Sequence, residues 1–301
     1  MVPSIPIRLV ALDLDGTLLN SQSTVSPRTR QAIADAVARG VIVLPCTGRP
    51  LSSLPPVVAR LPGIRYAITS NGAAVWDMGT DPLGAVYSRY ADADRRQTHE
   101  PTLLSAHPMP PEIAREVFAL YREYHGPLSI FSDGRSHLDA QGMELFQARK
   151  NHHTSTEAKQ PDDGRTHIVR DLPEWMSRHA HEVEKFCMFF DSVEIAQEAL
   201  PRFRALSAVE AVQGAPDNIE VTAKGVDKGA ALLALADQLG IPHEATAALG
   251  DSDNDRAMLA KAGVAAVMVN ARPEIRALGD IVSTRDNDHD GVAELFERLG
   301  L

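Results

Sequence analysis

The sequence is poor in features that mark several classes of protein. Only two of its 301 residues are cysteines, Cys46 and Cys187, so neither a disulfide framework nor a cysteine-rich zinc site is indicated. No apolar run approaches the roughly 18–20 residues of a membrane-spanning helix. The N-terminus lacks the cationic and apolar segments of a secretory signal. We therefore expect a cytoplasmic protein that does not bind membranes.

Positive charge is also in short supply. Lys and Arg number 30 against 40 Asp and Glu, a formal net charge of -10, which argues against a nucleic-acid-binding surface. A phosphate-binding protein of this composition would need a local cationic site. A hydrophobic content of 44% is ordinary for a globular protein, and the length allows one large domain or two smaller ones.

The most informative stretch is an apolar run, 9–12, that ends in two carboxylates, Asp13 and Asp15, followed by Gly16. The run is typical of a strand that is buried on both faces. Two ionised groups at its end are costly unless a cation lies between them. A turn after a core strand is the simpler interpretation of Asp15-Gly16, but the doubled Asp and further polar stretches downstream favour a site.

A βαβ unit follows this strand. Ser26-Pro27 reads as the start of a helix that Gly40 ends, and 41–44 is a second buried strand. The short spacing predicts parallel strands joined by a right-handed crossover. A third strand, 66–69, turns at Asn71-Gly72 into a further apolar run.

The alternation of strands and helices is lost near residue 82 and resumes near 223. The block between carries mixed helix and strand patterns, which predicts an inserted α+β domain. The overall prediction is an α/β fold, a doubly wound (Rossmann-like) parallel-sheet core with an inserted cap. The expected core is 1–81 and 223–301, and the expected cap is 82–222.

Four polar stations fall at strand ends or at a helix start. Parallel strands of one sheet point their carboxyl ends to the same edge, so these stations can meet. Carboxylates without Cys or His suit Mg2+, and a hydroxyl, a backbone N–H and an ammonium can hold a phosphate. The adjacent His152-His153 could suggest a second metal site, but adjacent histidines in a polar stretch are more often exposed to solvent. The stations are Asp13/Asp15, Thr47-Gly48-Arg49, Lys228, and Asp251 with Asn254-Asp255.

These stations, in this order, resemble the four motifs of the haloacid dehalogenase (HAD) superfamily of phosphatases. The long insertion between the second and third motifs is similar to the Cof-like subfamily (type IIB), which has a large α/β cap. The subfamily pattern also includes segments like Asn71-Gly72 and 268–271. The resemblance covers both core segments and, inside the cap, mostly the order of elements.

The resemblance implies a role for each motif residue. Asp13 would attack phosphorus and bind magnesium. Asp15 would act as acid and then base, with its backbone carbonyl on the metal, so its surroundings would have to favour the protonated form in the first step. Asp251 would be the remaining metal ligand, with Asp255 supporting it directly or through water. The phosphate would be held by Leu14 through its N–H, Thr47, Gly48, Lys228 and Asn254.

Several assignments stay open on the sequence alone. Arg49 could contact the substrate or form a salt bridge, and Asn71 could line the site or only form a hairpin turn. Lys228 is hard to explain structurally, because the first turn of a helix disfavours cations. Asp253 is expected to face solvent. The cap residues that could recognise a substrate include Asp133, Arg135, His137 and Lys185, although each could equally be a surface or packing residue.

The resemblance implies a Mg2+-dependent phosphomonoester hydrolase that acts through an aspartyl phosphate on a small phosphorylated metabolite, such as a sugar phosphate or a phosphorylated cofactor. A phosphomutase or a sucrose-phosphate-type phosphatase of the same superfamily is the alternative, and a non-catalytic ligand sensor is a remote one. The expected partner is the small phosphorylated substrate, without nucleic acid or membrane. The expected state is a monomer or a weak homodimer.

Overall fold

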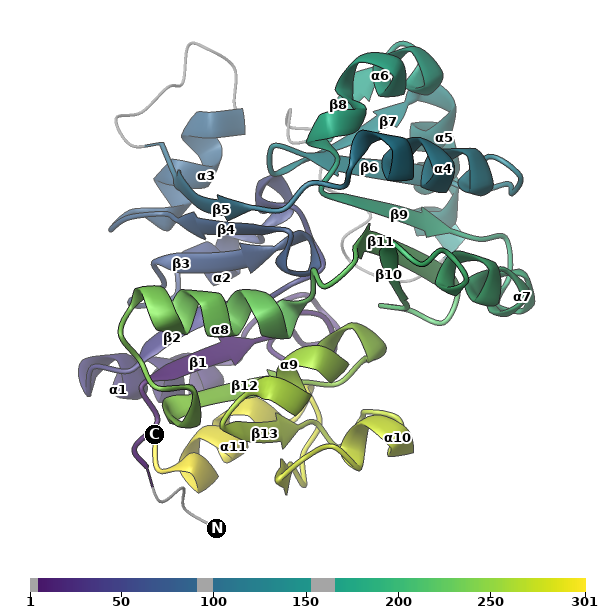
Figure 1. Ribbon diagram of the computed structural model, residues 1–301. Helices are drawn as coiled ribbons and strands as arrows, with labels where there is room; N and C mark the ends of the chain where they lie inside the picture. The colour runs from purple at the N-terminus through teal and green to yellow at the C-terminus, as the bar shows by residue number, and fades with distance from the viewer. Residues whose placement is uncertain (1–4, 91–99, 153–165) are drawn as a thin grey trace.

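A five-stranded parallel sheet, in the order β14-β13-β12-β1-β2, lies at the centre of the larger domain (Figure 1). The computed structural model describes residues 5–90, 100–152 and 166–301. This sheet confirms the predicted parallel core. Its strands are β1 (Leu9–Leu12), β2 (Ile42–Pro45), β12 (Thr246–Gly250), β13 (Val264–Val267) and β14 (Ile281–Val282).

Strand β1 is buried on both faces, as its apolar run predicts. Val10 and Leu12 belong to the hydrophobic cluster that includes helices α1 and α11, whereas Leu9 and Ala11 belong to the cluster that includes α8 and α9. The Ser26 hydroxyl accepts from the Thr29 N–H and caps α1 as expected. The helices are α1 (Pro27–Ala38), α8 (Lys228–Gln238), α9 (Arg256–Lys261) and α11 (Gly291–Leu299).

A three-stranded antiparallel sheet extends the core beyond β2. Strand β3 (Tyr66–Thr69) meets the chain after β2 through a parallel bridge between Cys46 and Ile68, and β4 (Ala74–Asp77) pairs with β3. The predicted hairpin turn is confirmed. Ser70 and Asn71 within it have positive φ angles, 53° and 57°, a strained conformation that orients both residues towards the other domain.

The inserted domain begins later than expected. Strand β5 (Thr102–Ala106), inside the range predicted for the cap, pairs with β4 of the core. Ala85 and Val86 of α3 (Pro82–Tyr90) also belong to the core cluster. The segment that packs around its own core therefore starts near residue 108 instead of 82. The boundary was misplaced because a short, mostly exposed edge strand has no strong apolar pattern.

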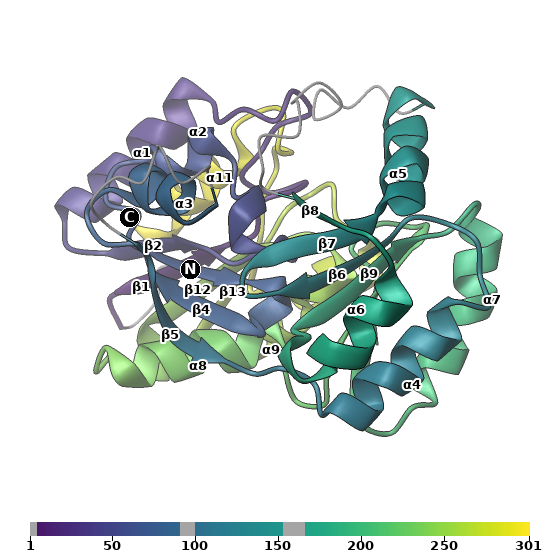
Figure 2. The same cartoon turned by 90° about the horizontal axis from the view of Figure 1, so that it is seen from above.

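The cap is a six-stranded sheet in the order β10-β11-β9-β6-β7-β8, with helices lining its outer side (Figure 2). Helices α4, α6 and α7 enclose the apolar cluster of the cap. No helix of the described residues is long and apolar enough to cross a membrane. The strands are β6 (Leu128–Ser132), β7 (Arg135–Asp139), β8 (Thr166–Val169), β9 (Lys185–Phe189), β10 (Val209–Val212) and β11 (Asn218–Ala223). The helices are α4 (Pro111–Tyr121), α5 (Ala140–His152), α6 (Leu172–His179) and α7 (Val193–Arg204).

Candidate active site

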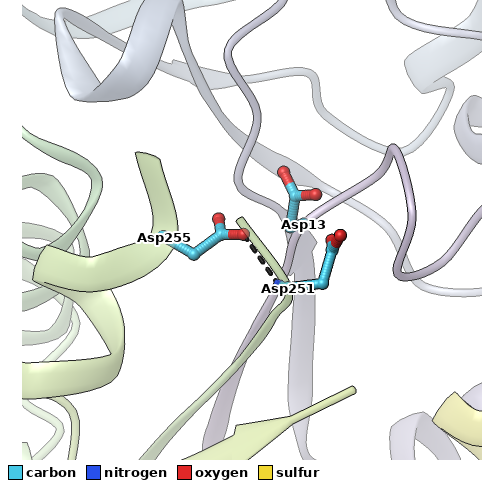
Figure 3. Close-up of side chains that lie close together, drawn as sticks. All are labelled: Asp13, Asp251 and Asp255. Atoms are coloured by element: carbon cyan, nitrogen blue, oxygen red, sulfur yellow. Dashed lines mark hydrogen bonds between the residues drawn. The ribbon is translucent and has the colours of Figure 1, made fainter. Parts of the chain in front are cut away.

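Three carboxylates meet at the carboxyl edge of the core sheet (Figure 3). Strands β1 and β12 are parallel neighbours, which places Asp13 and Asp251 side by side after their last residues. Asp255 joins them from the short 3-10 turn Asp253–Asp255. One carboxylate oxygen of each residue lies within 4.8 Å of the others. The structure thus brings together three residues that are 4 to 242 positions apart.

Lys228 is the cation that this cluster requires. Its side chain is fully buried, and its Nζ lies 2.5 Å from Asp13 Oδ1 and 2.7 Å from Asp255 Oδ1. Burial disfavours the ammonium, but Asp13 and Asp255 outweigh this effect and raise the pKa of Lys228 well above its usual value. Lys228 therefore stays charged. Burial and the charge of Asp255 also raise the pKa of Asp13, although the charge of Lys228 opposes them.

Asp255 organises the loop that carries Asp251. Its Oδ2 accepts from the backbone N–H groups of Asp251, at 2.9 Å, and Ser252, at 3.0 Å, while its Oδ1 accepts from Lys228. Thr17 donates to Asp251 Oδ1 at 2.8 Å. Because both oxygens of Asp255 have partners, Asp13 and Asp251 are the carboxylates best placed to bind a cation directly. Asp255 supports them through these hydrogen bonds.

The donor set fits a hard divalent cation. The ligands are carboxylate oxygens, which Mg2+ prefers, and the one grouping of three or more potential ligands among the described residues is this one. Burial, and after it the charge of the neighbouring Asp255, raise the pKa of Asp251 to about 7, while the Thr17 hydrogen bond and the charge of Lys228 oppose them. His153 lies outside the described residues, as does the side-chain environment of His152.

Asp15 and Arg49 form an ion pair at the edge of the site. Arg49 donates from Nε to Asp15 Oδ2 at 2.9 Å and from Nη2 to Oδ1 at 2.6 Å. Desolvation raises the pKa of Asp15, but the Arg49 charge and hydrogen bonds more than offset it and hold the pKa below the ordinary value. The expectation that the surroundings of Asp15 favour its protonated form concerns the first step with substrate bound, and it stays a prediction. A bidentate arginine stabilises the carboxylate.

The predicted phosphate-binding residues lie beside these carboxylates. The Asn71 N–H donates to the Thr47 carbonyl at 3.1 Å, and Asn254 Nδ2 donates to Asn71 Oδ1 at 3.4 Å. Lys228 Nζ lies 3.4 Å from Asn254 Oδ1, so the chain of contacts runs from Thr47 to Lys228. Leu14 is buried next to Asp13, and Gly48 follows Thr47. Asn71 thus belongs to this network as well as to the hairpin turn.

Asp253 does not face solvent as expected. Its side chain is 11% exposed and lies 3.3 Å from Arg204 of the cap helix α7 and 3.2 Å from Arg256 of α9. This ion pair joins cap and core, and only the folded chain brings Arg204 near Asp253. Two cap carboxylates that were not among the predicted site residues, Glu184 and Glu220, accept hydrogen bonds from Ser70 and Asn71 of the core. The available signal was Glu220 itself, a charged residue between the apolar residues Ile219 and Val221 of a strand.

The cap candidates have different surroundings. Lys185 is fully buried and reaches the core, where it donates to the Gly48 carbonyl at 2.5 Å. His137 packs on Trp175, with ring centroids 4.6 Å apart, and burial lowers its pKa to about 4. Asp133 lies in the turn before β7 with a φ of 50°, and Arg135 is the first residue of that strand. His137 is thus a packing residue, and Lys185 is the candidate that contacts the predicted phosphate loop.

The chain is similar in sequence and in fold to proteins of one superfamily. A sequence model of the haloacid dehalogenase-like hydrolases matches residues 10–95 and 96–296. The 5-amino-6-(5-phospho-D-ribitylamino)uracil phosphatase YcsE of Bacillus subtilis is 28% identical over 96% of this chain and 94% of its own length. A solved haloacid dehalogenase-like hydrolase from B. subtilis is 26% identical, with a TM-score of 0.78 over 97% of this chain and 100% of that one. The HAD subclass IIB sugar phosphatase BT4131 has the same fold, with 21% identity and a TM-score of 0.76 over 97% and 99%.

The chain therefore belongs to the haloacid dehalogenase-like hydrolase family. The predicted Cof-like assignment, with a type IIB α/β cap, and the prediction of a phosphatase of this superfamily are confirmed.

Proposed function

We propose that this protein is a Mg2+-dependent phosphomonoester hydrolase that acts on a small phosphorylated metabolite through an aspartyl-phosphate intermediate. The observation that carries the proposal is the buried Asp13 carboxylate, bonded to Lys228 at 2.5 Å and adjacent to Asp251. A carboxylate nucleophile beside a fixed cation is the arrangement that phosphoryl transfer requires. Bound magnesium would neutralise charge on the transferring phosphoryl group.

The site residues have separate roles in the proposed phosphoryl transfer. The Asp13 carboxylate attacks phosphorus, and Lys228, with Thr47, Gly48 and Asn254, stabilises the phosphoryl oxygens. Asp15 gives a proton to the leaving oxygen and later takes one from the hydrolytic water. Since Arg49 favours the ionised form of Asp15, the first step requires that this ion pair loosens when substrate binds. Asp13 and Asp251, with the backbone carbonyl of Asp15, would hold the metal.

The names of similar proteins support a small metabolite as the substrate. A cavity of about 430 Å³ also lies between the domains, lined by Asn71, Lys228 and Asn254 together with β10 and Thr222 of the cap, but Asp13, Thr47 and Asp251 do not line it, so it does not identify the substrate. A relative is named as a phosphatase of a phosphoribityl compound and a structural neighbour as a sugar phosphatase. A sugar phosphate or a phosphorylated cofactor is therefore the proposed substrate class.

The test is phosphate release from a panel of phosphorylated metabolites in the presence of magnesium, compared between the wild type and Asp13→Asn. The variant keeps the size of the side chain but removes the nucleophile, so activity is expected to fall by at least about 10³-fold. Rapid quenching with labelled substrate is expected to trap label on Asp13. Label on a serine or a histidine, or full activity in excess chelator, would refute the proposal. Cytoplasmic location and a monomeric or weakly dimeric state remain predictions that fractionation and sedimentation would check.

A further inference from the structure

The cap sheet carries two charged side chains on the face that meets the core. Lys185 begins β9, and Glu220 lies in the adjacent antiparallel strand β11. Strand alternation places their neighbours Phe186 and Val221 in the apolar cluster of the cap, so Lys185 and Glu220 point to the other face. Their Nζ and Oε2 atoms are 3.1 Å apart, and both side chains are buried.

Both charges form hydrogen bonds with the core at residues of the proposed phosphate site. Lys185 Nζ donates to the Gly48 carbonyl at 2.5 Å, and Asn71 Nδ2 donates to Glu220 Oε2 at 2.6 Å. A Cβ atom added at Gly48 would lie only 3.0–3.2 Å from Asn71 Oδ1, Glu220 Oε2 and Lys185 Nζ. Three polar side chains, two of them from the cap, therefore enclose Gly48.

The stability of the cap does not by itself explain why a buried Lys185–Glu220 ion pair is present. Desolvation of two charges offsets much of their attraction, and well-packed apolar pairs often replace buried ion pairs without loss. The pair is nevertheless fully bonded: Lys185 Nζ lies 4.7 Å from the centre of the Phe131 ring, and Asn218 donates to Glu220 Oε1 at 3.4 Å. Side chains locked in this way are suited to setting the position of a neighbouring group.

We propose that Lys185 and Glu220 are positioning residues of the cap, which place Gly48 and Asn71 for phosphate binding when the cap lies on the core. The inference rests on the proposed function and assigns the pair no contact with the phosphate. Lys185 and Glu220 belong to the cap, whereas Gly48 and Asn71 belong to the core, so an open cap would break both hydrogen bonds. The phosphate site is then complete only in the closed protein, which links chemistry to closure.

The experiment compares Lys185→Met, the double variant Lys185→Met/Glu220→Met, and a control, Arg178→Met. Arg178 is also a cap cation paired with a carboxylate, that of Glu174, but this ion pair is exposed to solvent whereas the Lys185–Glu220 pair is buried. Measurements are the thermal midpoint, kcat and KM on a metabolite and on para-nitrophenyl phosphate, and inorganic-phosphate affinity by calorimetry. The double variant removes the carboxylate that Lys185→Met leaves unpaired, so its thermal midpoint is expected to recover.

We expect kcat of Lys185→Met and of the double variant to fall by about 10²-fold on both substrates, as for a small misplacement of catalytic groups. Phosphate affinity is expected to fall in both variants, and Arg178→Met is expected to match the wild type in all measurements.

A double variant that regains wild-type kcat together with stability would overturn the positioning role. A loss of kcat on the metabolite alone, with kcat on para-nitrophenyl phosphate unchanged, would also overturn the positioning role, because the pair would then recognise the leaving group of the substrate. A wild type without phosphatase activity would refute the proposed function, whereas weakened phosphate binding in Lys185→Met would still support positioning.

Discussion

Replacing Lys228 by Met removes the buried cation between Asp13 and Asp255. At an effective dielectric constant of about 20, unit charges 2.7 Å apart attract by roughly 6 kcal/mol before desolvation is subtracted. Removal of one partner from a buried ion pair costs about 3–5 kcal/mol, because the remaining charge is left uncompensated. For a domain of this size that loss corresponds to a fall in the thermal midpoint of about 6–20 °C.

Two further variants separate this effect from a general loss of a lysine. Lys261→Met is the matched control: Lys261 Nζ also lies 2.7 Å from a carboxylate, that of Asp227, but its side chain is 39% exposed. Such an exposed pair contributes about 0–1 kcal/mol. The second variant adds Asp255→Asn to Lys228→Met. It removes one uncompensated carboxylate and is expected to restore part of the stability.

The assay is thermal unfolding in chelator, followed by the same measurement with magnesium. Magnesium is expected to stabilise Lys228→Met more than the wild type, because the acidic cluster of the variant lacks its internal cation. Activity is expected to stay at least about 10²-fold low even with magnesium, since no other group replaces the ammonium at the phosphate. If Lys228→Met matched Lys261→Met in both stability and activity, the electrostatic account of the site would be refuted.

Three more predictions follow from the site and the domain arrangement. The pKa of Asp251, raised to about 7 from an ordinary 3.8, means that between these values the folded protein keeps a proton that the unfolded chain has lost. Stability in chelator should therefore fall as pH rises through this window, and magnesium should remove the dependence; a flat profile in chelator would contradict the assignment. Arg49→Met should raise the pKa of Asp15 and move the corresponding limb of the pH–rate profile to higher pH, and an unmoved limb would count against Asp15 as acid and base. Replacing residues 108–223 by a Gly/Ser linker should abolish the preference among metabolites; activity on para-nitrophenyl phosphate should also fall, because Lys185 and Glu220 are lost, but proportionally less than activity on metabolites. A capless core, folded by circular dichroism, that kept the parent's ranking would refute the role of the cap.

Local patterns predicted the core elements well. The apolar run before Asp13, the Ser26 cap and the Asn71-Gly72 turn each depend on neighbours within a few residues, and β1, α1 and the β3–β4 hairpin follow them. The edge strand β5 escaped prediction because its pairing with β4 depends on chain about 25 residues away, and its own sequence is short and exposed.

The sequence by itself determined which polar residues can meet. Carboxylates after β1 and β12 and a lysine at the start of α8 can meet in a parallel sheet only at its carboxyl edge, so their order and spacing predicted the cluster, while their resemblance to the HAD motifs implied its chemistry. The tertiary structure alone decided which charges pair. Asp15 is held by Arg49, and Lys185 and Arg204 reach the core from the cap. These contacts depend on how two separately packed domains meet, and no local periodicity encodes the direction of a side chain across such an interface.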